Sequence, residues 1–413
     1  MSSKSCRPCI AGLFLLSGLS TAGAVWAEPA PPYGALLAQA RSGAPRLAEA
    51  EAGVAQAEGL ARQAAARPNP VVGVDVENLG NVGSPNGLDA RQTTASIEQT
   101  LELGGKRPAR IAAGRAGVAA AQARSELTRV EFAAQLAVNY AEAEAAAAKL
   151  SQADDSLAAA ETDARAAREL VDAGREAELR ALQAASERDA ARAERDEALA
   201  ARDAAFAKLS AFVGSPVAFD STSESLLNRA TSPTASSAGT TPAVAAAQAD
   251  RDAAAARVRV EARQAVPDVT VSAGVRRLQG DDATAFVAGV SVPLPLFNRN
   301  RGATDAARAE FTASQARLRQ AEFDADADLR AAQSQARSAG SRVEAATAGE
   351  AAAAEAYRLA RLGYDAGRLP LLELSSARRA LAAARVRTLD ARLARVRAEA
   401  EIARLTGRTP FGA

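Results

Sequence analysis

The chain has 413 residues, with 50 Lys and Arg against 49 Asp and Glu, so its formal charge at pH 7 is +1. It has no histidine and two cysteines, which excludes Ser-His-Asp and Cys-His catalytic groups and any metal site that needs imidazole. The mixed charges show no basic stripe of the kind that nucleic-acid binders carry, and the abundance of Ala, Arg, Glu, Leu and Gln is typical of long helices and coiled coils.

Residues 1–27 have the pattern of a secretory signal peptide. Two basic residues, Lys4 and Arg7, precede an apolar run over 10–25, and small residues form a cleavage site just before Glu28. Both cysteines fall inside this segment, so the mature chain is expected to have no thiol. Disulfides and thiolate metal sites are therefore not expected.

The rest of the chain reads as one unit written twice. Residues 172–174 (Asp-Ala-Gly) recur at 365–367, and residues 212–214 correspond to 405–407, in both cases 193 residues later. A constant offset of this kind indicates a duplication. The predicted units are a first repeat over 28–214, a linker rich in Ser, Thr and Pro over 215–242, and a second repeat over 243–413.

Each repeat begins with helical sequence that ends at a proline, Pro68 or Pro267, because proline cannot continue the helical hydrogen-bond ladder. Two segments of alternating apolar and polar residues follow, which is the pattern of a strand with one apolar face. Gly-, Asn- and Asp-rich connections predict that each pair of strands is a hairpin. The predicted strands cover residues 70–79, 92–101, 268–278 and 284–294.

Very long helices are predicted after each hairpin, from 107 to about 171 and from 302 to about 362. Turns at Gly174 and Gly367 then return the chain through a second helix, because glycine takes the left-handed conformation at little cost. At about 1.5 Å per residue, helices of this length are on the order of 90 Å long. Leucines at intervals close to seven or eight predict coiled-coil packing of these helices.

The amphipathic strands have the length of membrane β-barrel strands. Four strands cannot close a barrel, and an open edge in hydrocarbon would leave N–H and C=O groups unpaired. Either several copies pool their hairpins, or the strands form a small soluble sheet that caps a coiled coil. In the barrel interpretation Asp75, Glu77 and Glu98 face the lumen, because their neighbours of opposite parity are apolar.

The two strand-to-helix junctions, Gln99–Arg107 (QTLELGGKR) and Val292–Gly302 (VPLPLFNRNRG), resemble those of the TolC-type outer-membrane efflux family, in particular its heavy-metal branch represented by CzcC and CusC. The resemblance covers essentially the whole mature chain. It implies a mainly α fold with a small membrane β part: a homotrimer whose chains each give four strands to a twelve-stranded barrel in the Gram-negative outer membrane, continued by a long helical barrel in the periplasm.

The same resemblance implies partners and a location. The partners are a periplasmic adaptor protein, an inner-membrane pump of the resistance-nodulation-division type, and outer-membrane lipid, with no nucleic acid. The implied location is the outer membrane, with the helical part extending into the periplasm.

The resemblance also assigns roles to the hairpin tips. Gly174 and Gly367 close the tunnel at its inner end and meet the adaptor, and Tyr364 corresponds to the family's constriction tyrosine. Glu373 corresponds to an acidic residue six positions after the tip glycine, and a ring of such residues selects cations. The first repeat has Arg180 at this position instead, so an Arg180–Glu373 ion pair is an alternative closure. A glutamate at a helix start is also favourable with the helix dipole alone.

Lys106 and Arg107 at the first junction, and Asn298 and Arg299 at the second, are expected near the lipid headgroups at the inner surface of the membrane. Lys106 is not expected to bind phosphate, because a phosphate-binding loop needs an earlier glycine and a Ser or Thr after the lysine.

The expected function is a passive exit duct for heavy-metal cations, of the cobalt, zinc and cadmium type or the copper and silver type. No enzymatic activity and no cofactor are expected. Carboxylate-only sites bind transition metals weakly, so cargo selection is expected to lie in the pump. The alternatives are an exit channel for drugs or polypeptides and a secreted coiled-coil stalk.

Overall fold

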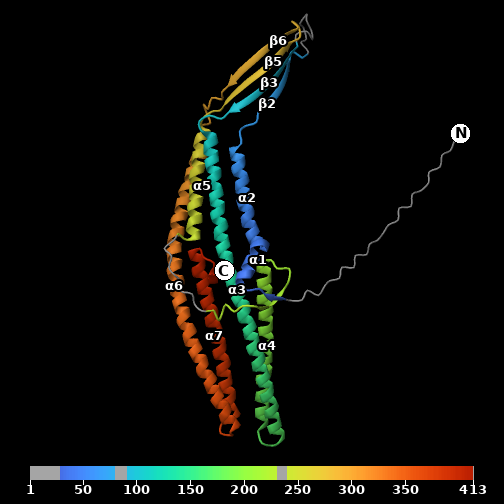
Figure 1. Ribbon diagram of the computed structural model, residues 1–413, viewed down its shortest axis with the longest axis vertical. Coiled ribbons are helices and arrows are strands. Elements are labelled where there is room, and N and C mark those ends of the chain that lie inside the picture. Colours follow the sequence, from blue (N-terminus) through green and yellow to red (C-terminus); the bar gives the residue numbers. More distant parts are fainter. Residues whose placement is uncertain (1–27, 80–90, 230–239, 413) are drawn as a thin grey trace, which may run out of the picture.

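The computed structural model describes residues 28–79, 91–229 and 240–412, and the expected signal peptide lies outside them. The molecule is elongated, with a β-sheet at one end and two helical hairpin tips at the other (Figure 1). In the part of the chain that the structure describes, no helix has the length and apolar character needed to cross a bilayer.

The two halves of the chain have the same order of long elements, and both are dominated by helix. The helix after each hairpin is the longest, with 67 residues in α3 and 65 in α6, so each spans about 100 Å. The first half contains β1 (Glu28–Ala30), α1 (Tyr33–Gly43), α2 (Pro45–Ala65), β2 (Val71–Glu77), β3 (Gln92–Leu101), α3 (Lys106–Asp172), α4 (Glu178–Val213) and β4 (Phe219–Thr222). The second half contains α5 (Pro242–Gln264), β5 (Val269–Leu278), β6 (Ala283–Ser291), α6 (Arg301–Asp365), α7 (Leu371–Thr406) and a short 3-10 turn at Pro410–Gly412.

The larger sheet has the strand order β2-β3-β5-β6, and every neighbouring pair is antiparallel. Its two hairpins join through β3 and β5, which pair from Gln92↔Leu278 to Leu101↔Val269. Strands β2 and β6 are the edges, and among the described residues no strand pairs with their outer sides.

Strand β6 ends at Ser291, earlier than the sequence predicts. Pro293 and Pro295 follow, and a proline has no N–H to donate to a strand ladder. Residues 292–300 therefore connect β6 to α6 without regular structure, whereas the matching connection of the first half is residues 102–105.

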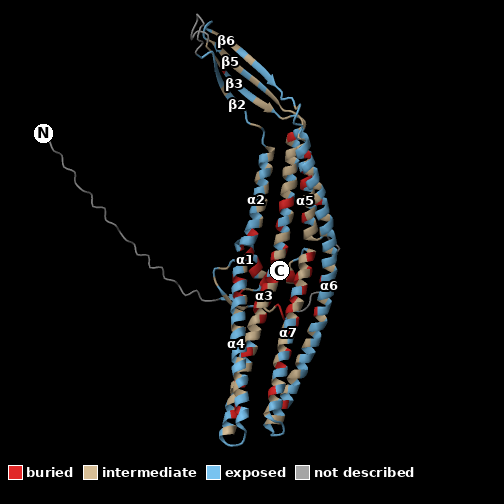
Figure 2. Ribbon diagram, turned by 180° about the vertical axis from the view of Figure 1, so that it is seen from behind, coloured by how far each residue is buried: buried red, intermediate tan, exposed pale blue. Residues whose placement is uncertain are grey.

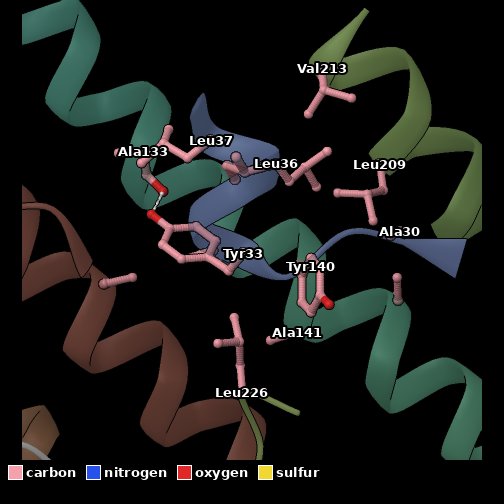
Figure 3. Close-up of a cluster of buried hydrophobic side chains, with 14 of the residues drawn as sticks. Ala30, Tyr33, Leu36, Leu37, Ala133, Tyr140, Ala141, Leu209, Val213 and Leu226 are labelled. Atoms are coloured by element: carbon pink, nitrogen blue, oxygen red, sulfur yellow. Dashed lines mark hydrogen bonds between the residues drawn. The ribbon is translucent and has the colours of Figure 1, made fainter. Parts of the chain in front are cut away.

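The main hydrophobic core lies halfway along the molecule, where α1, β1, β4 and the end of α4 pack around α3. Figure 3 shows Tyr33, Leu36 and Leu37 of α1 in this cluster, and the Tyr33 hydroxyl donates a hydrogen bond to the carbonyl of Ala133 over 3.0 Å. Away from this core most buried residues of α3 are alanines, which let helices approach closely. The sheet is almost wholly exposed or intermediate (Figure 2).

The expected linker over 215–242 is folded in its first part. Strand β4 pairs in parallel with β1, and Leu226 and Leu227 are buried. Glu144 of α3 accepts hydrogen bonds from the backbone N–H groups of Leu226 (2.9 Å) and Leu227 (3.2 Å). The first part of the expected linker is therefore a structured turn that packs against α3. Residues 230–239 of the expected linker lie outside the described residues.

Candidate functional site

One face of the large sheet is polar and carries the residues predicted to line a lumen. Residues that are directly opposite on neighbouring strands share a face. Asp75 lies opposite Thr94, and Glu77 opposite Gln92. Glu98 belongs to the same face, because it alternates in step with Thr94 along β3. The structure thus brings Asp75, Glu77 and Glu98 together on one surface.

Arg276 adds a positive charge to this polar face. Its guanidinium lies 3.7 Å from the carboxylate of Glu77 and donates hydrogen bonds to Thr94 Oγ1 (3.0 Å) and Gln92 Oε1 (3.3 Å). The alternation of residues along β5 predicted the face on which Arg276 lies. The contacts of Arg276 could not be predicted, because its partners on β2 and β3 are far away in the sequence. The polar face is therefore a mixed-charge surface, with three acids and one arginine among the described residues of the strands.

The opposite face of the sheet is apolar and uncovered. Val275 and Phe286 are opposite each other on it, as are Val271 and Val290. The Phe286 side chain is 92% exposed, and Val72, Val74 and Val76 of β2 are exposed on the same face. A continuous apolar surface of this size on a folded protein indicates contact with lipid or with another protein.

At the first strand-to-helix junction, Lys106 is buried and not available to headgroups, contrary to the expectation from the sequence. Its Nζ lies 2.8 Å from Asp268 Oδ2, at the start of β5, and Asp268 also accepts a hydrogen bond from the N–H of Leu103. The burial of Lys106 depends on this partner from the second repeat. Lys106 therefore ties the two repeats together below the sheet.

Arg107 and Asn300, which are at equivalent positions of the two repeats, each donate a hydrogen bond to a carbonyl near the end of the preceding helix. Arg107 Nε donates to the carbonyl of Ala65, at the end of α2, over 2.9 Å. Asn300 Nδ2 donates to the carbonyl of Glu261, near the end of α5, over 2.9 Å. Both satisfy carbonyls that a helix C-terminus leaves unpaired. Arg107 is therefore a capping residue as well as a cation at the junction.

Asn298 and Arg299 lie in the exposed connection between β6 and α6. Asn298 Oδ1 accepts a hydrogen bond from the N–H of Asn300, and Arg299 Nε donates to the carbonyl of Pro295. Among the described residues Arg299 has no ion-pair partner, unlike Lys106 at the equivalent position of the first repeat.

The two hairpin tips have the same backbone geometry. Gly174 and Gly367 both have φ of 69°, a left-handed conformation that favours glycine. After Gly174 the N–H of Arg175 donates to the carbonyl of Leu170 over 2.8 Å, and the bond that follows Gly367 has the same length. Both tips lie at the end of the molecule away from the sheet (Figure 1).

Arg180 and Glu373 are exposed in the first turns of α4 and α7, and Tyr364 is half-buried in the last turn of α6. Within the described part of one chain, Arg180 and Glu373 form no ion pair. Large apolar side chains are exposed around them, which is unusual beside so much alanine and charge. These are Leu179 and Leu182 of the first hairpin and Leu359, Leu362, Leu369 and Leu372 of the second.

Three ion pairs between α3 and α7, which sequence reasoning missed, hold the two hairpins together. They are Glu142–Arg397 (2.9 Å), Lys149–Asp390 (2.7 Å) and Asp163–Arg378 (2.5 Å). The α3 members are separated by multiples of seven residues, which is a coiled-coil signal, but their partners are too distant in the sequence to be identified from it.

No group of three or more His, Cys, Asp or Glu side chains that could hold a metal ion occurs in residues 28–79, 91–229 and 240–412. The described residues thus present two distinct surfaces, a polar face of the sheet and a pair of hairpin tips with equivalent geometry.

The sequence of this chain is similar to those of known proteins. The family described as "Outer membrane efflux protein" matches residues 36–215 and 236–408. The chain is 44% identical over 406 residues to the nickel-cobalt-cadmium resistance protein NccC of Alcaligenes xylosoxydans xylosoxydans, covering 98% of this chain and 92% of that protein. It is 44% identical over 345 residues to the nickel and cobalt resistance protein CnrC of Cupriavidus metallidurans, covering 81% and 80%.

Solved structures with the same fold include CusC, with a TM-score of 0.74, 18% identity and coverage of 91% of this chain and 92% of that one. The open state of the MtrE outer membrane channel of Neisseria gonorrhoeae gives a TM-score of 0.76 at 19% identity, covering 91% and 89%. The CmeC outer membrane channel of Campylobacter jejuni gives 0.79 at 14% identity, covering 91% and 85%. These likenesses show a shared fold.

Proposed function

This chain belongs to the outer membrane efflux protein family, as its junction sequences predicted, and from that premise we propose that three copies of it form an exit duct for nickel and cobalt ions. The main observation in support of a duct is that, among the described residues, the four-stranded sheet has two unpaired edges and one uncovered apolar face. The cargo is supported by the names of the relatives, NccC and CnrC. The sequence-based expectation of cobalt, zinc and cadmium, or copper and silver, fits these names only partly, because it did not include nickel.

Three copies are proposed because the sheet cannot be complete alone. Pairing β6 of one chain with β2 of the next would satisfy both edges, and three chains would make a closed barrel of twelve strands. Closure removes the unpaired N–H and C=O groups that hydrocarbon does not tolerate. The apolar face, with Phe286 and Val290, would then contact lipid, and the polar face would line the lumen.

In this arrangement the lumen carries Asp75, Glu77, Glu98 and Arg276 from each chain. The acids outnumber the arginine, so the wall attracts cations without binding them tightly. No resident metal site is part of the proposal; the ion is cargo that passes through.

The tips are proposed as the inner gate and as the docking surface for a periplasmic adaptor. Gly174 and Gly367 set the turns, while Tyr364, Arg180 and Glu373 lie within the gate. Glu373 of three chains would form the acidic constriction. The exposed leucines at the tips support docking, because an apolar surface in water favours a protein partner.

Membership of the family supports a proposal for the remaining partners and the location. We propose removal of residues 1–27 on export, two repeats over 28–214 and 243–413 joined through 215–242, insertion in the Gram-negative outer membrane, and supply of cargo by an adaptor and a resistance-nodulation-division pump.

The proposal is tested in a strain that lacks the gene, with growth measured against increasing Ni²⁺ and Co²⁺. Loss of the gene should lower the tolerated concentration of both ions, and the wild-type gene on a plasmid should restore it. Tolerance to dyes and detergents, measured in the same strains, should not change. Sensitivity confined to dyes would favour a drug channel and contradict the proposed cargo.

A further inference from the structure

The connection between β6 and α6 carries the most exposed aromatic side chain among the described residues. Phe297 is 99% exposed, and Val292, Leu294 and Leu296 beside it are also exposed. No charged residue occurs in Val292–Phe297. We call this segment, Val292–Phe297, the apolar loop.

The backbone of the apolar loop is restricted within the loop, and the chain is fixed again just after it. Two prolines, Pro293 and Pro295, restrict its backbone, and the N–H of Leu296 donates to the carbonyl of Leu294 over 2.8 Å. Three residues beyond the loop, Asn300 Nδ2 donates to the backbone carbonyl and to the carboxylate of Glu261 in α5, both over 2.9 Å. Phe297 is therefore exposed on a segment whose backbone is held by local contacts.

Two arginines follow the apolar loop, Arg299 and Arg301, and both are exposed. Arg301 is the first residue of α6, where a positive charge opposes the helix dipole. Helix stability therefore does not explain these cations. The equivalent of Arg299 in the first repeat, Lys106, is buried against Asp268, so at this pair of positions it is Arg299 that presents its charge to the surroundings.

We propose that the apolar loop, with Arg299 and Arg301, is an anchor that inserts among the phospholipids of the membrane leaflet facing the periplasm. The loop continues directly from β6, whose Phe286 and Val290 belong to the uncovered apolar face of the sheet. It lies at the end of the sheet from which the helices extend, so it meets the periplasmic leaflet. This inference rests on the proposed function, because it needs the sheet to be in a membrane.

The chemistry of the segment matches the boundary between acyl chains and headgroups. Aromatic and aliphatic side chains are stabilised when they leave water for the upper acyl region. Arginines a few residues away can pair with phosphate groups, which they bind through two parallel hydrogen bonds. Three copies of the loop would fix the depth of the barrel at the point where the helical part begins.

Tryptophan fluorescence tests this depth directly. The single tryptophan of the chain, Trp26, lies in the predicted signal peptide, so Phe297→Trp gives the mature protein one reporter. The variant is reconstituted in phosphatidylethanolamine and phosphatidylglycerol vesicles whose acyl chains carry bromine either near the headgroup or near the methyl end. We expect loss of emission relative to unbrominated vesicles, and a larger loss with bromine near the headgroup.

Two matched variants serve as references. Phe286→Trp places the reporter on the proposed lipid face of β6, and it should lose emission in brominated vesicles. Phe323→Trp, at an exposed position 22 residues beyond Arg301 along α6, lies about 33 Å down the helix and should lose none.

The outcomes separate the two proposals. Loss for Phe286→Trp without loss for Phe297→Trp overturns the anchor and leaves the channel intact. No loss for either variant overturns the membrane position of the sheet and with it the proposed function. Equal loss with shallow and deep bromine at Phe297→Trp also overturns the anchor, because the side chain would then not be at the headgroup boundary.

A second measurement tests the arginines. With both arginines present, Phe297→Trp should lose more emission in brominated vesicles that contain phosphatidylglycerol than in brominated phosphatidylcholine vesicles. Adding Arg299→Gln and Arg301→Gln to this variant should reduce the loss in phosphatidylglycerol to the level seen in phosphatidylcholine. An unchanged difference between the two lipids would overturn the role of the arginines in holding the loop.

Discussion

Arg378 of α7 donates a hydrogen bond to Asp163 of α3 over 2.5 Å, and the two side chains are 18% and 21% exposed. Each residue is eleven positions from the tip glycine of its own hairpin, Gly367 or Gly174. The pair therefore joins the two halves of the duplicated chain close to their tips, at equivalent distances from both turns.

Removing either partner of this pair should destabilise the contact between the hairpins by about 1–2 kcal/mol, between the values for exposed and for buried pairs. Asp163→Ala and Arg378→Ala should each lower the free energy of unfolding, and the double variant should cost less than the sum. Denaturant titration of the detergent-solubilised protein measures this cycle. Asp390→Ala, which breaks the more exposed pair with Lys149, is the control and should cost less than about 1 kcal/mol. Equal costs at both sites would contradict the prediction.

Two glutamates on the packed helices should respond to pH in opposite directions. Burial opposes ionisation of Glu142, but hydrogen bonds from Lys208 and Arg397 outweigh it and lower the pKa of Glu142 below its ordinary 4.5. Its stabilising contribution is present above that ordinary value and is lost as the pH falls through the lower pKa of the folded state. Glu142→Gln should therefore lower the melting temperature at pH 7, and the difference from wild type should shrink on acidification.

Glu399 behaves in the reverse way. Burial raises the pKa of Glu399 above 4.5, and the nearby Arg395 offsets this only in part. Its ionisation therefore disfavours the folded state at pH values above the raised pKa, and this cost vanishes below the ordinary value. Glu399→Gln should raise the melting temperature at pH 7 and have no such effect near pH 4. A decrease at pH 7 would contradict the assignment.

The tip glycines should be sensitive to substitution for a purely conformational reason. A Cβ at Gly174 or Gly367 would meet nothing within 4 Å, so only the left-handed backbone is costly for alanine. Each Gly→Ala change should destabilise the chain by about 1–2 kcal/mol. Gly349→Ala, inside α6 with equally open space, should instead stabilise it by about 0.5–1 kcal/mol. Unfolding titrations of the three variants measure these effects. A Gly174→Ala variant with the same free energy of unfolding as the wild type would contradict the prediction.

The regular elements and the polar face of the sheet follow from local pattern. Alternation predicts the face shared by Asp75, Glu77 and Glu98, and the constant offset of 193 residues predicts that the two tips are equivalent. These features depend on neighbours in the sequence, which periodicity reports directly.

Features that depend on distant partners could not be predicted in this way. Asp163 and Arg378 are 215 residues apart. The burial of Lys106 needs Asp268 from the other repeat, and the turn at Leu226 is stabilised by Glu144. In each case the partner lies on an element that is distant in the sequence and that only the folded chain brings near.

In the proposed trimer β2 of one chain pairs with β6 of the next, and disulfide cross-linking detects this contact. Both natural cysteines precede residue 28, so the mature chain gives a clean background. Val74→Cys on β2 is combined in turn with Phe286→Cys, Ala288→Cys or Val290→Cys on β6. Within one chain these strands are the two edges of the sheet, about 14 Å apart, too far for an internal disulfide.

Ile97→Cys with Ala273→Cys, which are directly opposite on β3 and β5 of one chain, is the matched control and should form only an internal disulfide. For at least one β2–β6 combination, oxidised membranes analysed under non-reducing conditions should show covalent species that end at three copies. Monomer alone for every β2–β6 combination, in membranes where the control disulfide forms, would contradict the pairing of β2 with β6 between chains.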